Sequence, residues 1–475
     1  MVRPVASDKV ITAERRPGGR RADARRNRAR ILDAAEALLA GDARATMAAV
    51  AEAAGVARST LNRHFPTRRD LDRALERRSV GAGADRAAAG RFGEIQPDGL
   101  DALRVLDEVP PDLVADQLVA EARRVAGVPV ALYVIDVDGS GLLRLAGEEP
   151  ELPARIDAPL GLGHEIAPES LPELYAYVRS ELPGCVPVPL WLRGRATGVL
   201  LSVGTPRRAL TQIARQGAAA LELANGYTDA FEAVRRGRAT SPAAEMQLDL
   251  LPGARIVRVG GGELAGGLLP SADVGGDWFD FAENRDGTWL AIADAAGEGP
   301  VAAGRAAVSL GALRSARRRG LGLQASALVV HQLVHDLGDD FSVSAVLAHW
   351  QASIATFSWV ACGHEPPLLV ARAGAIEPLD GDDGAPLGAG ARDRRFGVHS
   401  RRLDGGERVV LHSDGVAARR SRGGRRFGPA GIADAVAAAP ATSAAATARA
   451  IQHAVARFGE GPPEDDAAVV VLAIE

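Results

Sequence analysis

Aspartates crowd into one short segment in the second half of the chain, where they could hold a cation. The segment PSADVGGDWFDF, at residues 270–281, carries Asp273, Asp277 and Asp280 beside a pair of glycines and runs on into tryptophan and phenylalanine. Like charges this close repel one another unless something positive lies among them. An exposed acidic turn is the alternative interpretation, but such a turn rarely carries large aromatic side chains.

More aspartates stand at the ends of predicted strands further along the chain. Asp294 ends the apolar strand in WLAIADAAGEG, and Asp414 follows the apolar strand RVVLH. Asp465 and Asp466 precede the last strand, AAVVVLAIE. Carboxylate oxygens without histidine or cysteine select hard cations, so we expect Mg²⁺ or Mn²⁺ among these aspartates.

Residues 241–475 resemble the metal-dependent type 2C serine/threonine protein phosphatases, in their bacterial SpoIIE-like subclass. The segments that occur in that family's order are LLP, VGGDWFD, ADAAGEGPVAA, ACGHEPPLL, GAPLG, LHSDGV, RFG and EDD. The resemblance implies an α+β four-layer (αββα) sandwich and a phosphoric monoester hydrolase that uses two Mn²⁺ or Mg²⁺ ions.

The resemblance also assigns roles to the aspartates. It makes Asp277 and Asp294 the catalytic pair that bridges the metals, and it implies that the remaining ligands are the carbonyl of Ala295, Asp414 and Asp465. Asp466 is expected to be a neighbour of the site, and Asp280 a candidate to support a ligand. Trp278 and Phe279 are expected in the sandwich core behind the site.

The chemistry implied is hydrolysis of a phosphate ester by a metal-activated water. Two cations about 3.5–4 Å apart can deprotonate a shared water, orient it in line and neutralise the phosphoryl charge. Aspartates can hold these cations without competing as nucleophiles. No cysteine nucleophile is required, and neither Cys185 nor Cys362 stands in a phosphate-cradling loop.

The chain departs from the family's usual pattern at positions around the site. Glu298 stands where a histidine or lysine is usual, and Ala417-Ala418 where a glutamate is usual. ACGHE replaces the commoner NAGHP, which leaves His364 in place; we expect a structural turn histidine there, with phosphate orientation as the alternative. None of these changes touches a metal aspartate, so the sequence favours an active phosphatase.

The N-terminal part of the chain has a different charge from the rest. Residues 1–80 carry 18 lysines and arginines against 10 acidic residues, whereas the whole chain has a net charge of −4. A basic N-terminal segment followed by an acidic remainder fits a nucleic-acid contact confined to the N-terminus. Residues 1–23 are predicted to be a basic arm, either a solvated tail or a DNA contact.

Helical periodicity follows the arm. ARILDAAEALLA, TMAAVAEAAGV and ARSTLNRHF each predict a helix, with Gly55 at a sharp turn, Pro66 ending the last helix, and Leu61 and Phe65 in the core. The amino-acid sequence of residues 24–80 resembles that of the all-α helix-turn-helix domain of TetR-type regulators.

The TetR resemblance implies that the second helix of the motif lies in the major groove of double-stranded DNA. The residues expected at this surface are Arg58, Ser59, Thr60, Asn62, Arg63 and His64. Asn62 replaces the tyrosine that is usual in the family. A three-helix module used for packing or protein contact is the alternative.

The middle of the chain predicts a sensor domain. Residues 81–110 are predicted to be a linker. VPVALYVIDVDGSGLLRLAG and VPVPLWLRGRATGVLLSVG predict antiparallel hairpins between helices. Residues 111–225 thereby resemble an α/β GAF domain, for which the residues indicate no ligand.

The closing helix of this domain is predicted to continue. Apolar residues recur every three or four positions over 210–238, which predicts one connecting helix. Such a helix could be the seam of a homodimer or could be packed within one chain, and the pattern leaves both open.

The length of 475 residues fits a multidomain protein. The sequence has no apolar run that could cross a membrane and no signal peptide, so we expect a cytoplasmic protein without a membrane partner.

The predicted function is dephosphorylation of a signalling phosphoprotein, by resemblance an anti-sigma factor antagonist, regulated by the GAF-like sensor and coupled to DNA binding. The alternative is a DNA-binding regulator whose phosphatase fold is inactive and serves as a sensing or phosphoprotein-binding module.

Overall fold

The computed structural model describes most of the chain beyond residue 29. The described residues are 30–38, 45–68, 70–71, 74–75, 106, 108–204, 208–237, 241–271, 275–338, 340–381, 384–440 and 442–475. The predicted arm at 1–23 and nearly all of the predicted linker at 81–110 lie outside them. The chain divides into two compact units, Met1–Gln96 and Pro97–Glu475. No helix within the described ranges is long and apolar enough to cross a membrane.

The first unit holds the predicted helices. A helix at residues 30–38 is followed by α2 (Met47–Ala53) and α3 (Arg58–His64). Thr46 caps α2 by accepting a hydrogen bond from the Ala49 N–H at 3.3 Å. Gly55, between α2 and α3, has a φ of +61°, which favours glycine. The helices enclose a small core formed by Ile31, Leu32, Ala35, Val50, Ala51, Ala54, Leu61, Phe65 and Leu71.

The second unit begins with an antiparallel sheet between helices. Its elements are η1 (Pro111–Leu113), α6 (Val114–Ala126), β1 (Val130–Ile135), β2 (Leu142–Ala146), β3 (Arg155–Ile156), η2 (Pro168–Ser170), α7 (Leu171–Glu181), β4 (Cys185–Leu192), β5 (Arg195–Val203), α8 (Arg208–Asn225) and α9 (Ala230–Arg235). The strand order is β3-β2-β1-β5-β4. Both predicted hairpins, β1–β2 and β4–β5, are confirmed. Apolar residues of α6 and α8 pack on one face of the sheet and those of α7 on the other.

The prediction of one continuous helix over 210–238 is wrong. The helix α8 ends at Asn225, and α9 begins at Ala230, whose N–H donates to the Thr228 hydroxyl at 3.2 Å. Gly226 lies at the interruption, where its backbone freedom disfavours helix. Most of the apolar residues that predicted a long helix are buried against the sheet, and Phe231 of α9 is part of the same core, whereas Leu223 and Tyr227 are exposed.

The phosphatase-like region follows α10 (Pro242–Leu250) and is built from two sheets. Its strands are β6 (Ile256–Val259), β7 (Gly262–Leu269), β8 (Asp277–Asn284), β9 (Gly287–Ala295), β10 (Val343–Gln351), β11 (Thr356–Cys362), β12 (Leu368–Val370), β13 (Ile376–Pro378), β14 (His399–Arg402), β15 (Arg408–His412) and β16 (Ala467–Ile474). One sheet has the order β14-β11-β10-β9-β8, and the other β13-β12-β15-β16-β7-β6. The short η3 (Ala352–Ile354) joins β10 to β11.

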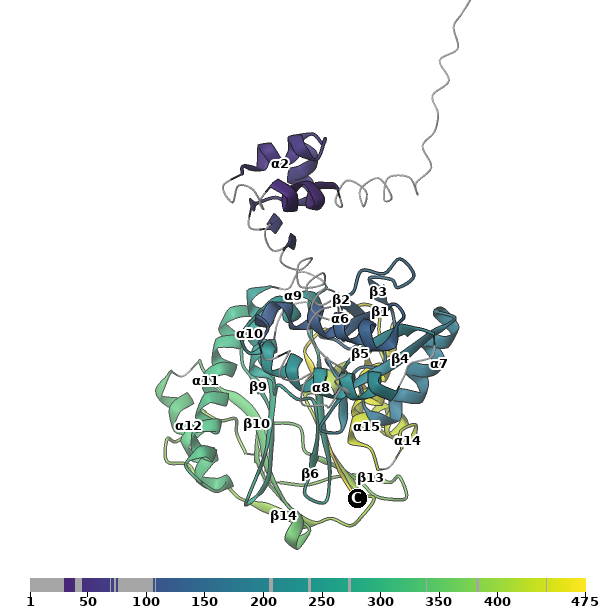
Figure 1. The fold of residues 1–475 in the computed structure, drawn as a ribbon. Coiled ribbons are helices and arrows are strands. Elements are labelled where there is room, and N and C mark those ends of the chain that lie inside the picture. The colour runs from purple at the N-terminus through teal and green to yellow at the C-terminus, as the bar shows by residue number, and fades with distance from the viewer. Residues whose placement is uncertain are drawn as a thin grey trace, which may run out of the picture. The chain divides into compact units, whose positions relative to one another are not determined.

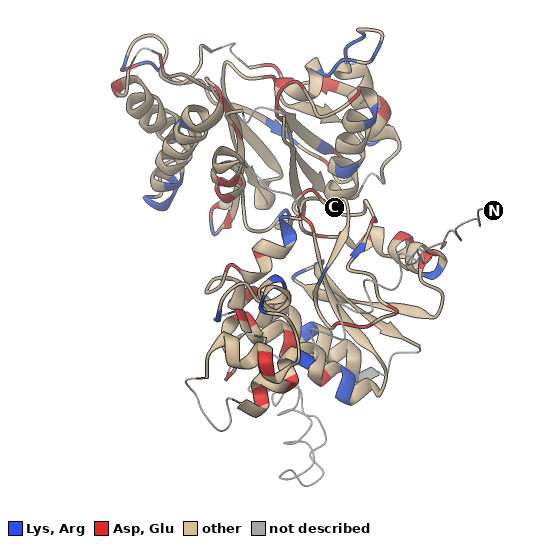
Figure 2. Cartoon of the chain, turned by 90° about the horizontal axis from the view of Figure 1, so that it is seen from above, with Lys and Arg blue, Asp and Glu red and all other residues tan. Residues whose placement is uncertain are grey.

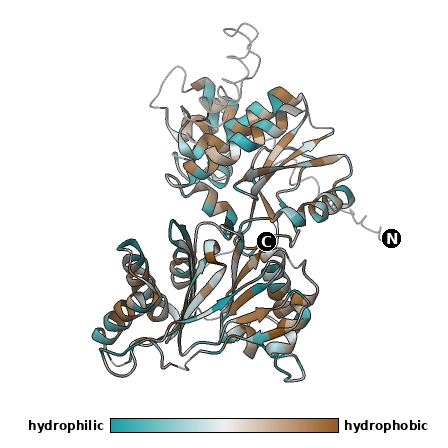
Figure 3. Ribbon diagram, turned by 90° about the horizontal axis from the view of Figure 1, so that it is seen from below, coloured by the Kyte–Doolittle hydropathy of each residue, from teal (hydrophilic) through white to brown (hydrophobic). Residues whose placement is uncertain are grey.

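Helices cover the outer face of each sheet (Figure 1). The first sheet carries α11 (Gly299–Arg318) and α12 (Leu323–Asp336), and the second carries α14 (Gly428–Ala437) and α15 (Ala444–Phe458). The predicted order of layers, helix–sheet–sheet–helix, is therefore present. The strand β16 is apolar along its whole length because both of its faces are buried. Figure 3 shows hydrophobic residues recurring along the strands of this region.

Candidate metal centre

The hairpin of β8 and β9 places the first two predicted ligands opposite each other. Asp277 begins β8 and pairs in register with Asp294, near the end of β9. Directly opposed residues on an antiparallel pair have their side chains on the same face, close together. Asp277 is only 2% exposed, and its Oδ2 atom is buried without a hydrogen-bond partner. A buried carboxylate oxygen with no donor is an atom that a cation would satisfy.

The second sheet supplies the other predicted ligands from two adjacent strand ends. Ser413, directly after β15, accepts a hydrogen bond from the Ala468 N–H at 2.9 Å and donates to the Asp466 carbonyl at 3.1 Å. These bonds fix the start of α13 (Asp414–Ala418) beside the segment that enters β16. The residue after Asp414 must be glycine, because a Cβ on Gly415 would lie 2.1 Å from the Asp466 carbonyl oxygen.

The electrostatics of the aspartates show that they form one cluster. Burial first, and then Asp294, raise the pKa of Asp277 well above its usual range. Burial, followed by the charges of Asp414, Asp465 and Asp466, raises the pKa of Asp294 to about 6. Burial and then the neighbouring carboxylates also raise the pKa of Asp465. Asp277, Asp294, Asp414 and Asp465, which come from both sheets, are therefore close enough to influence one another's charge.

The donor set fits a hard divalent cation. It consists of carboxylates whose mutual repulsion a positive ion would relieve, together with the unpartnered Asp277 Oδ2. Within the described ranges, no three or more His, Cys, Asp or Glu side chains already have the arrangement of a metal site. The assignment of individual ligands is therefore a proposal, which rests on the cluster and on its chemistry.

Ala295 and Gly276 lie at the same end of the hairpin. The Ala295 N–H donates to the Gly276 carbonyl at 3.1 Å, and a Cβ on Gly276 would lie 1.9 Å from the Ala295 carbonyl oxygen. Only glycine allows this approach of the two backbones. The carbonyl predicted as a ligand is thus held in place next to Asp294.

Asp466 is a neighbour of the cluster whose own carboxylate is occupied. It accepts hydrogen bonds from the backbone N–H groups of Ser271 at 2.8 Å and Gly275 at 3.0 Å, and from the side-chain amide of Gln247. Gln247 also donates to the Asp277 carbonyl at 3.0 Å. Sequence reasoning missed Gln247; its only signal was a glutamine among the apolar residues of α10, where it is 1% exposed.

Asp280 does not support the metal ligands, and this part of the prediction is wrong. Its carboxylate forms ion pairs with Arg314 at 2.7 Å and Arg317 at 2.8 Å, both on α11. Side chains alternate along a strand, so Asp280 faces the helix layer while Asp277 faces the opposite sheet. The predicted burial of Trp278 and Phe279 is confirmed, and Asp273 lies outside the described residues.

The chain departs from the family's usual pattern at Glu298 and in the ACGHE segment that contains His364. Glu298 directly precedes α11, and its charge contributes to the raised pKa of Asp465. Burial lowers the pKa of His364 to about 4, so its ring is neutral near pH 7. Its Nδ1 atom lies 3.3 Å from the Glu365 carbonyl, and its Nε2 atom is buried without a partner.

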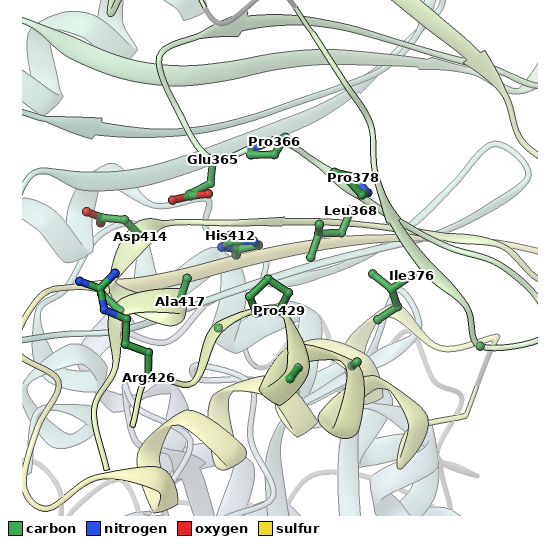
Figure 4. Close-up of a pocket in the computed structure, with 15 residues that line it drawn as sticks. Glu365, Pro366, Leu368, Ile376, Pro378, His412, Asp414, Ala417, Arg426 and Pro429 are labelled. Carbon is green, nitrogen blue, oxygen red and sulfur yellow. The ribbon is translucent and has the colours of Figure 1, made fainter. Parts of the chain in front are cut away.

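A cavity of about 930 Å³ lies directly beside the aspartate cluster, and Asp414 forms part of its wall (Figure 4). Ala417 and Ala418, at the position where the family usually has a glutamate, also line it. The remaining lining residues are Glu365, Pro366, Leu368, Gly374, Ile376, Pro378, His412, Arg426, Gly428, Pro429, Ala430 and Ala433.

The predicted DNA-binding residues all lie on α3 in the first unit. Arg58, Ser59, Asn62 and Arg63 are exposed, while Thr60 and His64 are half-buried. The helix therefore presents polar and basic side chains outward and Leu61 inward. In the second unit, basic and acidic residues are interspersed over the helices (Figure 2).

Comparisons with known proteins match one family near the N-terminus of the chain and another in its C-terminal part. Residues 284–475 match the family described as Stage II sporulation protein E (SpoIIE), and residues 31–75 match the family described as bacterial regulatory proteins, tetR family. No curated protein matches the chain.

Solved structures similar to the chain include phosphatase domains from several bacteria. The RsbU and RsbW domains of Rv1364c from Mycobacterium tuberculosis are 24% identical, with a TM-score of 0.41, over 46% of this chain and 62% of that one, which is less than two thirds of its length. The SiaA-PP2C domain of Pseudomonas aeruginosa is 18% identical, with a TM-score of 0.40, over 45% of this chain and 86% of that one. The phosphatase domain and a regulatory fragment of SpoIIE from Bacillus subtilis are 12% identical, with a TM-score of 0.41, over 84% and 98%.

Asp294, Asp414 and Asp465 lie within the residues that match the SpoIIE family, and Asp277 lies just ahead of them. The chain therefore carries a SpoIIE-type phosphatase domain that includes residues 284–475 and a TetR-type domain that includes residues 31–75.

Proposed function

We propose that this protein is a metal-dependent serine/threonine phosphatase that removes phosphate from a signalling phosphoprotein. The observation that supports this most strongly is the convergence of Asp277, Asp294, Asp414 and Asp465 around a buried, unpartnered carboxylate oxygen. Two Mn²⁺ or Mg²⁺ ions would be held by this cluster, with Asp277 and Asp294 as the principal ligands.

When bound, the ions would supply an activated water and neutralise charge on the phosphoryl group. The chain's own residues hold the site in place. Ser413 and Gly415 bring the start of α13 against β16, and Gly276 lets the Ala295 carbonyl stand beside Asp294. The cysteines are not nucleophiles here: Cys185 and Cys362 are both buried, and burial raises the pKa of Cys362 to about 12.

The proposed substrate is a phosphorylated anti-sigma factor antagonist or a similar phosphoprotein. The support for this class is the resemblance of residues 241–475 to SpoIIE-like phosphatases, together with the family match at residues 284–475. The proposed location is the cytoplasm, where such a substrate and DNA are both accessible.

We further propose that residues 111–225 are a GAF-like sensor that regulates the phosphatase. The support is a buried contact between the two regions of the second unit. Glu165 is fully buried, forms an ion pair with Arg195 of β5, and accepts backbone hydrogen bonds from Arg255 and Ile256, each at 2.9 Å. Since Ile256 begins β6, a movement of the sensor sheet would act directly on the phosphatase sheet.

A second route supports the same regulation. Arg236, directly after α9, forms ion pairs with Glu232 of α9 and Glu245 of α10. The helix α10 also carries Gln247, which contacts Asp277 and Asp466. The sensor region is therefore connected to the proposed metal ligands by a short chain of contacts.

The test is the turnover of p-nitrophenyl phosphate by the full-length protein with Mn²⁺ and, in parallel, with a chelator. We expect hydrolysis that depends on the metal. Hydrolysis that persists in chelator would contradict the metal mechanism. No hydrolysis in either condition would favour the alternative, in which the phosphatase fold of a DNA-binding regulator only binds or senses a phosphoprotein.

A further inference from the structure

The cavity beside Asp414 is not accounted for by the metal site alone. Hydrolysis of a phosphate ester needs the aspartates and their ions, whereas this cavity of about 930 Å³ extends away from them. Its far wall consists of β12 and β13 on one side and the first turns of α14 on the other (Figure 4). It is therefore a candidate for binding the part of the substrate that is not the phosphate.

The two ends of the cavity differ in chemistry. Asp414, Glu365 and Arg426 stand together at one end (Figure 4). The other end is apolar, and its walls are formed by Leu368, Ile376, Pro378, Pro429, Ala430 and Ala433. Ligand sites commonly combine an apolar lining with a few polar groups that fix orientation.

Arg426 is the one arginine or lysine among the residues that line the cavity, and no carboxylate within the described chain forms an ion pair with it. A guanidinium group matches the oxygens of a phosphate in a bidentate geometry. His412 also lines the cavity, and its Nδ1 atom lies 3.0 Å from the Ser413 carbonyl.

We propose that the cavity is a specificity subsite, in which the apolar end takes an apolar side chain close in sequence to the phosphorylated residue while Arg426 faces the phosphate end. This rests on the proposed phosphatase function. The continuity of the cavity with Asp414 supports it, because a substrate whose phosphate lies at the aspartates can extend along the walls of this cavity.

The charged residues at the polar end increase the preference for an apolar over an acidic side chain of the substrate. Glu365 lines the cavity and, unlike the aspartate cluster, is not among the proposed metal ligands, so its negative charge is not offset by the ions. An acidic side chain near the phosphoserine would be repelled there and would lose solvation in the apolar end. The subsite therefore favours an apolar neighbour and rejects an acidic one.

The test uses the full-length protein with Mn²⁺ and synthetic phosphoserine peptides that are otherwise alanine. A single leucine or aspartate is moved through the positions on both sides of the phosphoserine. We expect one position at which leucine gives a kcat/KM about tenfold above aspartate, the scale of discrimination that an apolar pocket provides. The difference is expected mainly in KM, because the side chain is bound equally in the ground state and the transition state.

Variants locate the preference in the cavity. Ile376→Asp on β13, and independently the exposed Ala430→Glu on α14, place a charge in the apolar end and should abolish the preference for leucine. Ile354→Asp is the matched control, because Ile354 is 54% exposed on η3 and does not line the cavity. It should keep the preference.

The outcomes separate this inference from the function on which it rests. Hydrolysis of p-nitrophenyl phosphate without a leucine preference at any position overturns the subsite and leaves the phosphatase in place. A leucine preference that survives in both Ile376→Asp and Ala430→Glu also overturns it. Absence of Mn²⁺-dependent hydrolysis of every substrate overturns the proposed function, and the subsite with it.

Discussion

At the scale of single residues, the aspartates of β8 have separate roles. Asp277 and Asp280 are three positions apart on one strand and therefore face opposite sides. Asp277 lies opposite Asp294 in the aspartate cluster, and Asp280 forms ion pairs with Arg314 and Arg317 of α11. The acidic segment thus combines a proposed chemical site with an attachment for a helix.

Asp280→Asn separates these roles. It removes the charge that holds the two arginines, so we expect the free energy of unfolding to fall by about 1.5–3 kcal/mol, the scale of hydrogen bonds to charged groups. Turnover per folded molecule should stay close to that of the unmodified protein. Chemical denaturation and a p-nitrophenyl phosphate assay measure the two effects, and a loss of turnover with unchanged stability would assign Asp280 to the metal site instead.

The raised pKa values of the cluster predict how the stability of the metal-free protein depends on pH. Burial and neighbouring carboxylates raise the pKa of Asp294 to about 6, above the ordinary value of about 3.9. The folded state therefore binds a proton more tightly than the unfolded state, and stability falls as the pH rises from about 4 through about 6.

In chelator, the midpoint of thermal unfolding should fall between about pH 4.5 and pH 6.5. The fall should be shallower in Asp294→Asn, which lacks the titrating group. Mn²⁺ should raise the midpoint most at the upper end of this range, because only the deprotonated carboxylates bind metal. An identical slope in the two proteins would show that Asp294 does not titrate as described.

At the scale of elements, the contact between β5 and β6 depends on a buried carboxylate. Glu165 has an arginine and two backbone N–H groups as partners, all away from solvent. Glu173 forms a second ion pair between the same two regions, from α7 to Arg449 of α15 at 3.0 Å, but it is largely exposed. The two pairs make a matched comparison.

Glu165→Gln leaves Arg195 buried without its counter-charge, so we expect a loss of about 3–5 kcal/mol in the free energy of unfolding. Glu173→Gln should cost at most about 1 kcal/mol, as exposed ion pairs do. Denaturant titration of both variants measures the difference. Equal, small effects would mean that Glu165 does not hold the sensor region to the phosphatase region.

At the scale of the whole molecule, recognition of a two-fold DNA site would require two copies of the chain. A helix-turn-helix that reads a two-fold operator needs its partner about 34–36 Å away. The stripe over 210–238 is not available as the seam, because Phe231 and most of the apolar residues of α8 are buried in their own domain. Leu223 and Tyr227 remain, 70% and 81% exposed near the end of α8.

We therefore propose a homodimer contact at Leu223 and Tyr227. Leu223→Glu combined with Tyr227→Glu should give a monomer in sedimentation experiments and weaken the binding of a two-fold DNA site. Leu333→Glu combined with Leu337→Glu, at exposed positions at the end of α12, is the control and should remain dimeric. A dimer that survives the first pair of substitutions would place the contact elsewhere.

Much of the site was predictable from the sequence because its signals are local. Asp294 lies near the end of an apolar strand and Asp414 follows one by two residues, and a glycine comes soon after each of them in the sequence. The roles of Asp280 and Gln247 were not predicted, since each depends on a helix that packs against the site from elsewhere in the chain.

The break between α8 and α9 and the cavity were not predicted from the sequence either, because they too depend on more than a local pattern. Apolar periodicity continues across Gly226, so the pattern does not indicate that α8 ends at Asn225 and that α9 begins at Ala230. The cavity is formed by β12, β13 and α14, which are distant in sequence from one another and from the metal hairpin. No periodicity could have indicated it.

The most direct test of the account is Mn²⁺-dependent hydrolysis of p-nitrophenyl phosphate by Asp294→Asn in the full-length protein. Asp393→Asn, at an exposed aspartate that accepts a hydrogen bond from Gln332, is the matched control. The account predicts that Asp294→Asn is folded and inactive, because it removes a bridging anion and not core volume, while Asp393→Asn keeps its activity. Undiminished turnover in folded Asp294→Asn would contradict the two-metal site.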